Sequence, residues 1–515
     1  ERLYLERDGA KVFDDAVIYE PSLVDAFYQQ RGYQPAWTDP SYAREMLKLL
    51  ASSTLEGLNP ADYHYEEILE LVEAFDAPWS DADALRAQAE VLLTDGIVLY
   101  GKHLVQGKVD PRSLDASWNY SQRVIKPADV ARNLADAIER RQVAAEMEAL
   151  KVDTLFYRLM RDKLALYRKR ALTEQFSPVP SDKVLREGDR HPNVTALGTR
   201  LRQMGYLDSR ADTGDYFDAD MAVAVEALQR DHALDVDGIV GGQSFRVLNL
   251  SAREREALLR INLDRARWIR QDQTDEYLVV NIAGFELYYL RQGELIWQTP
   301  VMVGSIDTRT PIFRKRMRYL EFNPTWNVPR GLLSRSLYPR LASDPGYVDA
   351  KGYEFFGAGG KVDPATIDWS AYTGANFPYR VVQKPGPDNA MGRVKFMFPN
   401  RHAVYLHDTP SRELFARSQR AFSAGCIRVK NPLELARLLL DDPDNWSAER
   451  IQALVDSARP QQVVQMQRPV DVLLMYWTVS PEDGQRLEFH EDVYGLDAAA
   501  LAALEAPPAS MPFDG

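Results

Sequence analysis

Cysteine is nearly absent from this chain: Cys426 is the only one in 515 residues. A single cysteine cannot form a disulfide within the chain, which excludes a disulfide-stabilised fold. The residue must therefore serve packing, metal binding or reactivity. His191 and His232 have no cysteine or acidic cluster at ligand spacing around them, so we predict no metal site and no cofactor.

Long apolar runs and an excess of basic charge are also absent. No stretch approaches the roughly 20 apolar residues of a membrane-spanning helix, and the most apolar run, Val470 to Val479, is predicted to be a strand. The 62 basic residues are outnumbered by 75 acidic ones, giving a net charge of −13. This balance argues against a nucleic-acid partner. Because the sequence begins at Glu1 and not at a methionine, we expect a removed upstream segment, either a signal peptide or a membrane anchor.

The chain is too long for one hydrophobic core, and about three domains are expected. Residues 1–185 space their apolar side chains with helical period, for example from Tyr65 to Phe75, and are predicted to be a helical domain. A polar linker follows, and a compact helical segment covers 192–250. This segment contains Asp237-Gly238 and Gly241, where the chain must turn sharply. A connecting helix is expected over 251–274.

From residue 275 the sequence changes to short segments rich in β-branched and aromatic residues, which predict strands up to about residue 500. A loop-rich insertion at 331–383 interrupts them and is typical of a lid. Paired strands are expected at 467–495. The Ala- and Pro-rich tail, 501–515, is expected to be poorly ordered.

The surroundings of Cys426 favour reactivity over packing. Small residues, Ser423-Ala424-Gly425, precede it and fit a tight turn whose backbone N–H groups point at a reacting carbonyl. His407 stands nineteen positions upstream (426 − 407 = 19). A neighbouring imidazole is the usual means of activating a thiol.

These residues resemble the signature of the L,D-transpeptidases, a His followed after a similar spacer by Ser/Thr-His-Gly-Cys. Further matches are Asn323-Pro324-Thr325-Trp326-Asn327 and Asn389-Ala390-Met391-Gly392. With the helical domain, the insertion and a segment at 192–250 that resembles a peptidoglycan-binding module, the chain is similar to the large, scaffold-bearing, YcbB-like members of Gram-negative envelopes. One departure is Ala424, which stands where the family usually has a second histidine. A mechanism with two histidines is therefore in doubt, although one imidazole suffices to accept a thiol proton.

The resemblance implies a multidomain α+β fold with a scaffold domain (1–185), a three-helix peptidoglycan-binding-like module (192–250) and a β-rich catalytic domain (275–500). It implies a cysteine acyltransferase that forms 3→3 cross-links in peptidoglycan. Cys426 would attack the stem peptide with His407 as base, Gly425 and Cys426 N–H groups would hold the oxyanion, and the Asp408 carbonyl would orient the imidazole. D-Ala would leave from a tetrapeptide donor stem.

Other residues carry weaker expectations for substrate binding. Tyr405 lies two before His407, so both side chains share one face of a strand; it lines the donor site or packs. Arg428 binds a stem carboxylate or forms a structural salt bridge, and Ser423 donates to the site or caps the turn. The motif resemblance also assigns three residues to the acyl groove: Trp326, Asn389 and Gly392.

The resemblance further implies a place in the periplasm, carbapenem-type β-lactams as inhibitors, and a role in cell-wall biogenesis and cell shape. A D,D-carboxypeptidase that supplies tetrapeptides and a glycan synthase are implied partners. Two alternatives stay open from the residues alone. One is a non-catalytic wall-binding scaffold with a buried Cys426, and the other is a related hydrolase, which differs only in using water as the acceptor. A papain-type cysteine peptidase is disfavoured because it places Cys before His in the chain.

Overall fold

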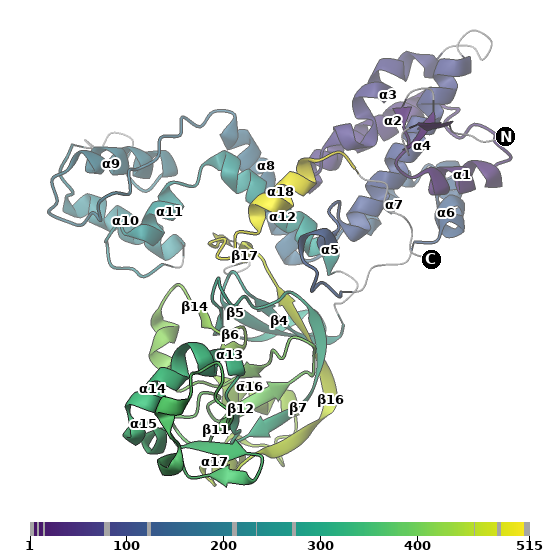
Figure 1. The fold of residues 1–515 in the computed structure, drawn as a ribbon. Helices are drawn as coiled ribbons and strands as arrows, with labels where there is room; N and C mark the ends of the chain where they lie inside the picture. The colour runs from purple at the N-terminus through teal and green to yellow at the C-terminus, as the bar shows by residue number, and fades with distance from the viewer. Residues whose placement is uncertain are drawn as a thin grey trace. The chain divides into compact units, whose positions relative to one another are not determined.

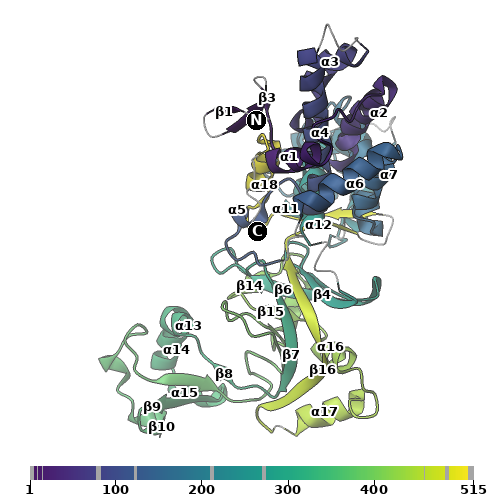
Figure 2. The same cartoon turned by 90° about the vertical axis from the view of Figure 1, so that its right-hand side faces the viewer.

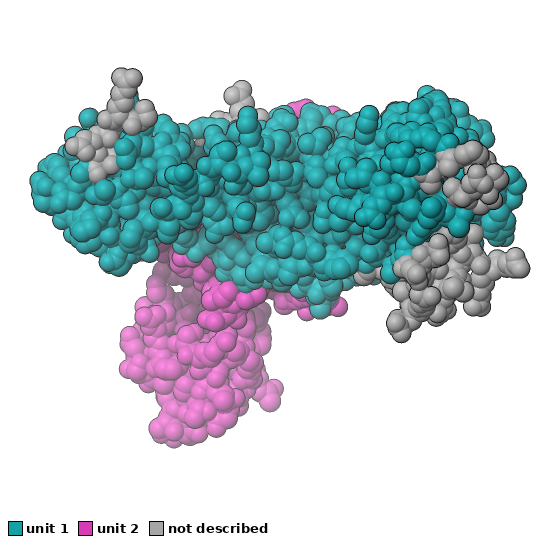
Figure 3. Space-filling model, turned by 90° about the horizontal axis from the view of Figure 1, so that it is seen from above, with its two compact units in different colours: residues 1–116, 120–272, 477–515 teal, residues 117–119, 273–476 magenta. Residues whose placement is uncertain are grey.

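The computed structural model describes residues 5–7, 10–13, 16–76, 83–120, 125–208, 214–232, 234–269, 274–457, 459–481 and 486–508. The chain separates into two compact units, coloured separately in Figure 3. Unit 1 comprises residues 1–116, 120–272 and 477–515, and unit 2 comprises 117–119 and 273–476. Within the described ranges, no helix is long and apolar enough to cross a membrane.

Unit 1 begins with a helical domain built around α4 (Asp83–Gln106) (Figure 1). Every residue of this helix from Ala89 to Val105 is buried, because other helices pack on all its sides. The surrounding elements are α1 (Pro21–Gln30), α2 (Pro40–Ala51), η1 (Ser52–Glu56), η2 (Pro60–Tyr63), α3 (Tyr65–Leu71), η3 (Val72–Phe75), α5 (Pro111–Leu114), α6 (Pro127–Glu139) and α7 (Val143–Leu150). A small antiparallel sheet, which helical periodicity did not predict, precedes them: β1 (Leu5–Arg7), β2 (Ala10–Phe13) and β3 (Ala16–Val17).

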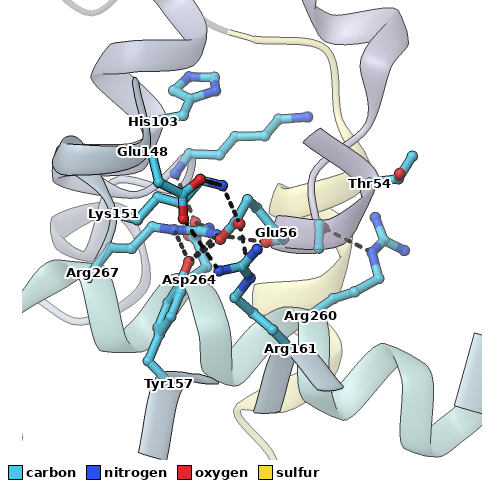
Figure 4. A network of polar contacts seen from close by, with 12 residues as sticks. Thr54, Glu56, His103, Glu148, Lys151, Tyr157, Arg161, Arg260, Asp264 and Arg267 are labelled. Atoms are coloured by element: carbon cyan, nitrogen blue, oxygen red, sulfur yellow. Dashed lines mark hydrogen bonds and ion pairs between the residues drawn. The ribbon is translucent and has the colours of Figure 1, made fainter. Parts of the chain in front are cut away.

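Two longer helices, α8 (Leu155–Ala171) and α12 (Ala252–Trp268), pack against each other and join this domain through buried charges. Figure 4 shows the network around Glu56, whose side chain is fully buried. Tyr157 of α8 donates to Glu56 Oε2 at 2.7 Å, and Arg267 of α12 donates to the Glu56 carbonyl at 2.5 Å. Since each partner comes from a different element, the network ties η1, α8 and α12 together.

The segment predicted as a three-helix module contains α9 (Pro192–Met204), α10 (Ala219–Asp231) and α11 (Gly242–Leu248) around a small apolar core. Its turn after α10 is organised by Gln229. The Gln229 Oε1 accepts from Asp237 N at 3.0 Å and from Gly238 N at 2.9 Å. Gly238 has φ +69, a left-handed conformation that explains glycine at this position.

The end of the chain differs from the prediction. The strands β17 (Val479–Pro481) and β18 (Leu487–Phe489) pair only with each other among the described strands, and both belong to unit 1. The β-rich unit therefore ends at Tyr476 and not near residue 500. In unit 1, Asn262 of α12 donates to Thr478 Oγ1 at 2.9 Å, and its Oδ1 accepts from Thr478 N at 3.1 Å. The segment predicted as a poorly ordered tail contains part of a helix, α18 (Asp497–Glu505); residues 509–515 lie outside the described ranges.

Unit 2 is built on a nine-stranded sheet in the order β14-β6-β15-β13-β12-β7-β16-β4-β5. Strand β5 also pairs with β6, so the sheet closes on itself. The strands are β4 (Glu276–Asn281), β5 (Glu286–Arg291), β6 (Glu294–Gly304), β7 (Arg314–Phe322), β12 (Val394–Met397), β13 (Leu406–His407), β14 (Ala421–Ser423), β15 (Ile427–Val429) and β16 (Gln462–Met475). The helical elements η8 (Arg412–Ala416), α16 (Pro432–Leu440) and α17 (Ala448–Asp456) accompany it.

The predicted insertion forms a second, four-stranded sheet in the order β10-β9-β11-β8, which Figure 2 shows beside the main sheet with α13–α15. Its strands are β8 (Trp326–Asn327), β9 (Tyr353–Gly357), β10 (Gly360–Val362) and β11 (Arg380–Gln383). Its helical elements are α13 (Arg330–Leu332), η5 (Leu333–Leu337), α14 (Tyr338–Ser343), α15 (Pro345–Ala350), η6 (Pro364–Thr366) and η7 (Trp369–Ala371). Many aromatic side chains give it an apolar core of its own. We call this part, residues 326–383, the cap.

Candidate active site

Cys426 follows a tight turn that ends β14. Gly425 has φ +110, in a region that L side chains rarely adopt, which explains glycine before the cysteine. The Ser423 hydroxyl closes the turn by donating to the Cys426 carbonyl at 2.5 Å and accepting from Gly425 N at 3.1 Å. Thr310 Oγ1 anchors it by donating to the Gly425 carbonyl at 2.9 Å. In this structure Ser423 shapes the turn.

Strand pairing brings Cys426 beside Tyr405 and His407 beside Arg428. Strands β13 and β15 are parallel, and His407 is paired with Arg428. Ile427 N donates to the Tyr405 carbonyl at 3.1 Å, which places Tyr405 next to Cys426, two residues before the His407–Arg428 pair. Because side chains alternate along a strand, all four project to one face of the sheet. Residues nineteen apart in sequence thus share one site.

The Cys426 thiol is partly exposed. Its sulfur lies 3.7 Å from the Ala403 carbonyl oxygen and is hydrogen-bonded to the Tyr405 side chain. Burial raises the pKa of the thiol, whereas the Tyr405 hydrogen bond and the positive charges of Lys395 and Arg428 oppose this increase. The resting cysteine is therefore a protonated thiol.

His407 is buried and fixed through Nδ1, which donates to the Asp408 carbonyl at 2.5 Å. A carbonyl only accepts, so Nδ1 carries the proton and Nε2 is left as the basic nitrogen. Burial, together with the charge of Arg428, lowers the pKa of His407 to about 3 although hydrogen bonds to the Asp408 and Met391 backbone oppose this, so the imidazole is neutral. In the described part of the chain no hydrogen bond joins the Cys426 and His407 side chains.

Asp408 is held in place by its own buried carboxylate. Its Oδ2 accepts from Arg393 N at 2.9 Å, and its Oδ1 accepts from Arg412 Nη2 at 2.8 Å. These contacts fix the carbonyl that binds His407. Asp408 therefore acts on the site through its backbone carbonyl, and its side chain holds that backbone in place.

The turn before Cys426 uses one of the two backbone N–H groups that were predicted to bind the oxyanion. The Gly425 N–H already donates to Ser423 Oγ, so it is not free in this structure. No acceptor for the Cys426 N–H is found among the described residues. The Cys426 N–H, which has no acceptor among the described residues, and the Tyr405 hydroxyl, which contacts the sulfur, are thus the candidate oxyanion donors.

Arg428 lies on the same face of the sheet as Cys426 and His407, and one of its nitrogen atoms has no partner in the described part of the chain. Its Nε has no hydrogen-bond partner within the described ranges. Burial lowers the pKa of its guanidinium, and the nearby Cys426 opposes this decrease. The other role predicted for Arg428 was a structural salt bridge, but Arg428 forms no salt bridge with the described residues.

The three residues assigned from motif resemblance have different surroundings. Trp326 is partly buried on β8, paired with Gln383 at the edge of the cap sheet. Asn389 is buried, and its amide donates to the Lys384 carbonyl at 2.7 Å while its Oδ1 accepts from Met391 N at 2.7 Å. Gly392 has φ +60 and lies against the Asp408 side chain. Asn389 and Gly392 thus form the loop next to His407, and their contact with substrate stays a prediction.

Two residues of this face were not found from the sequence: Lys395 of β12 and Glu321 of β7. Lys395 is paired with His407 on one side and with Glu321 on the other. Alternation with the buried Val394 and Phe396 could have placed Lys395 on the opposite face of its strand. The sequence alone does not say which strands flank it. No group of three or more metal-ligating side chains occurs in the part of the chain that the structure describes.

Comparison with known families matches three parts of the chain. Residues 22–164 match the model "Scaffold domain", residues 190–248 match "Putative peptidoglycan binding domain", and residues 275–464 match "L,D-transpeptidase catalytic domain". The chain carries an L,D-transpeptidase catalytic domain. The transpeptidase domain coincides with the unit that holds Cys426 and His407, and the other two matches lie in unit 1. The three matches are the domains that the sequence resemblance predicted, in the predicted order.

One curated relative and two solved structures are similar to part of this chain. A "Putative L,D-transpeptidase" of Haemophilus influenzae is 38% identical over 222 residues, which cover 43% of this chain and 44% of that protein. The match therefore spans less than half the length of that relative. Solved L,D-transpeptidases of Stackebrandtia nassauensis and Xylanimonas cellulosilytica are 12% and 15% identical and cover 58% and 57% of this chain. These matches cover 97% and 99% of those chains, with TM-scores of 0.21 and 0.18.

Proposed function

We propose that this protein forms 3→3 cross-links in peptidoglycan through an acyl-enzyme on Cys426 and releases D-Ala from tetrapeptide donor stems. One observation carries the proposal. A partly exposed thiol lies beside the Tyr405 hydroxyl, and a neutral imidazole fixed through Nδ1 lies two residues further along the chain from Tyr405. A packing cysteine would need neither neighbour. The structure thus favours an enzyme over a non-catalytic scaffold.

The proposed reaction uses the neutral thiol of Cys426 and the neutral imidazole of His407. Cys426 Sγ attacks the carbonyl carbon between the third stem residue and the terminal D-Ala, while the thiol proton passes to His407 Nε2. Proton transfer accompanies the attack because neither the thiolate nor the imidazolium is favoured beforehand. Substrate binding is expected to bring the two side chains together, since catalytic hydrogen bonds are often long in free enzymes.

The negative charge on the substrate oxygen is held by the Cys426 N–H and the Tyr405 hydroxyl; loss of such a donor typically slows turnover about 100-fold. When the tetrahedral intermediate collapses, the C–N bond breaks and His407 returns its proton to the departing amine of D-Ala. A thioester remains on Cys426. The side-chain amine of an acceptor stem then attacks it, gives its proton to His407, and the thiolate leaves and is reprotonated.

Arg428 supplies the binding part of the proposal. Its unpartnered Nε lies on the same face as the thiol, and a guanidinium is well suited to a stem carboxylate. The cap and Trp326 bound the acyl groove in this proposal, and the module at 190–248 holds glycan. A protein with these domains acts outside the cytoplasm, and we place it in the periplasm. D,D-carboxypeptidase and glycan synthase activities act with it.

Mass spectrometry of products from purified disaccharide-tetrapeptide tests the proposal. Wild-type protein is expected to release D-Ala and form a 3→3 dimer, while Cys426→Ala, checked for fold by circular dichroism, forms none. Tripeptide without dimer would identify a hydrolase. Absence of both products, together with no mass increase on Cys426 after carbapenem treatment, would show that the domain is a scaffold.

A further inference from the structure

A row of charged side chains crosses the main sheet next to Cys426. Lys395 of β12 has His407 of β13 as its neighbour on one side and Glu321 of β7 on the other. Cross-strand partners project to the same face of a sheet, so the row lies on the face that carries the thiol. It ends at β16, where Glu321 is paired with the apolar Val463.

Lys395 has two close partners and little exposure to water. Its Nζ lies 3.5 Å from Glu321 Oε2 and 4.7 Å from the centre of the Tyr405 ring. The side chains of Lys395 and Glu321 are only 13% and 12% exposed. A shielded ammonium interacts with an aromatic face more strongly than an exposed one, and a shielded ion pair is screened less by salt.

We propose that Lys395 and Glu321 form a positioning pair for the reaction. Glu321 holds the Lys395 ammonium against the Tyr405 ring, which keeps the Tyr405 hydroxyl at the Cys426 sulfur, and the ammonium charge favours the thiolate. The inference rests on the proposed function, since it assigns these residues to the acylation step. Neither residue touches the reacting atoms in this role; both act through Tyr405 and through charge.

The electrostatics agree with this arrangement. The Lys395 charge lowers the pKa of Cys426 against the larger effect of burial, and the Glu321 charge adds to the burial that raises the pKa of Tyr405. The titratable and charged groups that face Cys426 from the packed strands are Tyr405 and His407 (β13), Arg428 (β15), Lys395 (β12) and, through Tyr405, Glu321 (β7). Since the two members of the pair have opposite charge, their removal should act on the thiol in opposite directions.

The first test measures the rate of Cys426 alkylation by iodoacetamide against pH in the full chain, by mass spectrometry. Lys395→Met is expected to raise the pKa of Cys426 and slow alkylation at pH 7 about threefold, equivalent to a pKa increase of about 0.5. Glu321→Gln keeps an oxygen acceptor for Lys395 but removes the charge, so alkylation should become faster. Lys395→Arg should restore the wild-type profile. Changes in the same direction in both variants, or none, would overturn the inference.

A second measurement separates positioning from charge. In a Tyr405→Phe background, Lys395→Met is expected to change the alkylation rate by less than half as much as in the wild type, because the hydroxyl through which it acts is gone. A full effect would overturn the positioning role. As matched controls, Lys361→Met and Glu354→Gln remove the same groups from a Lys–Glu pair on the cap sheet, and the alkylation profile should not change. Alkylation needs no wall substrate, so these measurements test the effect of Lys395 and Glu321 on the thiol separately from the proposed function. A wild-type protein that is alkylated as expected but releases no D-Ala from tetrapeptide would refute the proposed function alone.

Discussion

Gly392 lies directly against Asp408: a Cβ at position 392 would stand 2.4 Å from the Asp408 Cβ. Gly392→Ala should therefore displace Asp408, whose carbonyl binds His407 Nδ1. Because a shift of about 1 Å in a catalytic group lowers rates about 100-fold, we expect D-Ala release to fall by 10-fold or more. Steady-state kinetics of D-Ala release measure this change.

Gly359→Ala is the matched control for that variant. No atom lies within 4 Å of a Cβ built on Gly359, and its φ is not in the left-handed region. Its turnover should stay within about twofold of the wild type. An active Gly392→Ala would contradict this prediction and show that the loop takes up the added methyl group without displacing the Asp408 carbonyl from His407.

Tyr405→Phe removes the hydroxyl that is hydrogen-bonded to the Cys426 sulfur. That hydrogen bond lowers the pKa of the thiol, and its loss should raise the pKa and leave one oxyanion donor fewer. We expect D-Ala release to slow by about 10-fold to 100-fold with little change in KM. A variant that loses affinity but keeps kcat would instead make Tyr405 a packing or binding residue.

The sequence was enough to predict the turn before Cys426, which the structure confirms, because a turn is a local feature. The catalytic roles of Cys426 and His407 stay predictions. The sequence also placed Tyr405 and His407 on one face, since two residues apart on a strand always share a face. The sequence alone did not show the register in which distant strands pair. That β15 runs parallel to β13, so that Arg428 and not Cys426 lies opposite His407, follows from the pairing of strands distant in sequence.

The same limit explains Lys395, Glu321 and the boundary at Tyr476. Glu321 and Lys395 are 74 residues apart and meet only because β7 and β12 are neighbours in the sheet. The apolar run from Val470 to Val479 was predicted to be one strand, yet β16 ends at Met475 and the following residues pair elsewhere. Composition does not show where a continuous apolar segment passes from one folded unit to the next.

Acid should weaken the fold of unit 2 through His407. In the folded state burial lowers the pKa of His407 to about 3, whereas an unfolded histidine titrates near 6.5. Between these values the unfolded chain binds a proton that the folded chain does not, so the free energy of unfolding falls as pH drops below 6.5, by up to about 1.4 kcal/mol per pH unit. Hydrogen exchange of unit 2 peptides between pH 7.5 and 5 measures this effect.

Glu286 should act with the opposite sign in the same unit. Burial raises the pKa of its carboxyl to about 7, so the folded chain binds the extra proton and gains stability as pH falls toward 4.5. His407→Gln should therefore reduce the acid sensitivity of unit 2, while Glu286→Gln should increase it. If the stability of unit 2 depended on pH in the same way in both variants, the opposite pKa shifts of His407 and Glu286 would be contradicted.

The buried carboxylate of Glu56 should be essential for the stability of unit 1. Its Oε1 lies 2.9 Å from Arg161 Nε and 3.1 Å from Lys151 Nζ, and its Oε2 accepts from Tyr157. Glu56→Gln removes the buried counter-charge that these cations share with Arg267, and only Glu148 and Asp264 remain to pair with them. Removing one partner of a buried ion pair typically lowers the free energy of unfolding by about 3–5 kcal/mol. Hydrogen exchange of α8 and α12 peptides reports this opening without requiring the two units to unfold together.

The exposed pair Arg44–Asp76 provides the comparison. Asp76→Asn breaks an ion pair that water already screens, and the expected loss is below about 1 kcal/mol. If Glu56→Gln were equally mild, the charges around Glu56 would have found other partners or water, and the attachment of α8 and α12 to η1 would rest on apolar contacts alone. A large difference between the two variants would instead show that this buried carboxylate joins the scaffold domain to the helix that leads toward the catalytic unit.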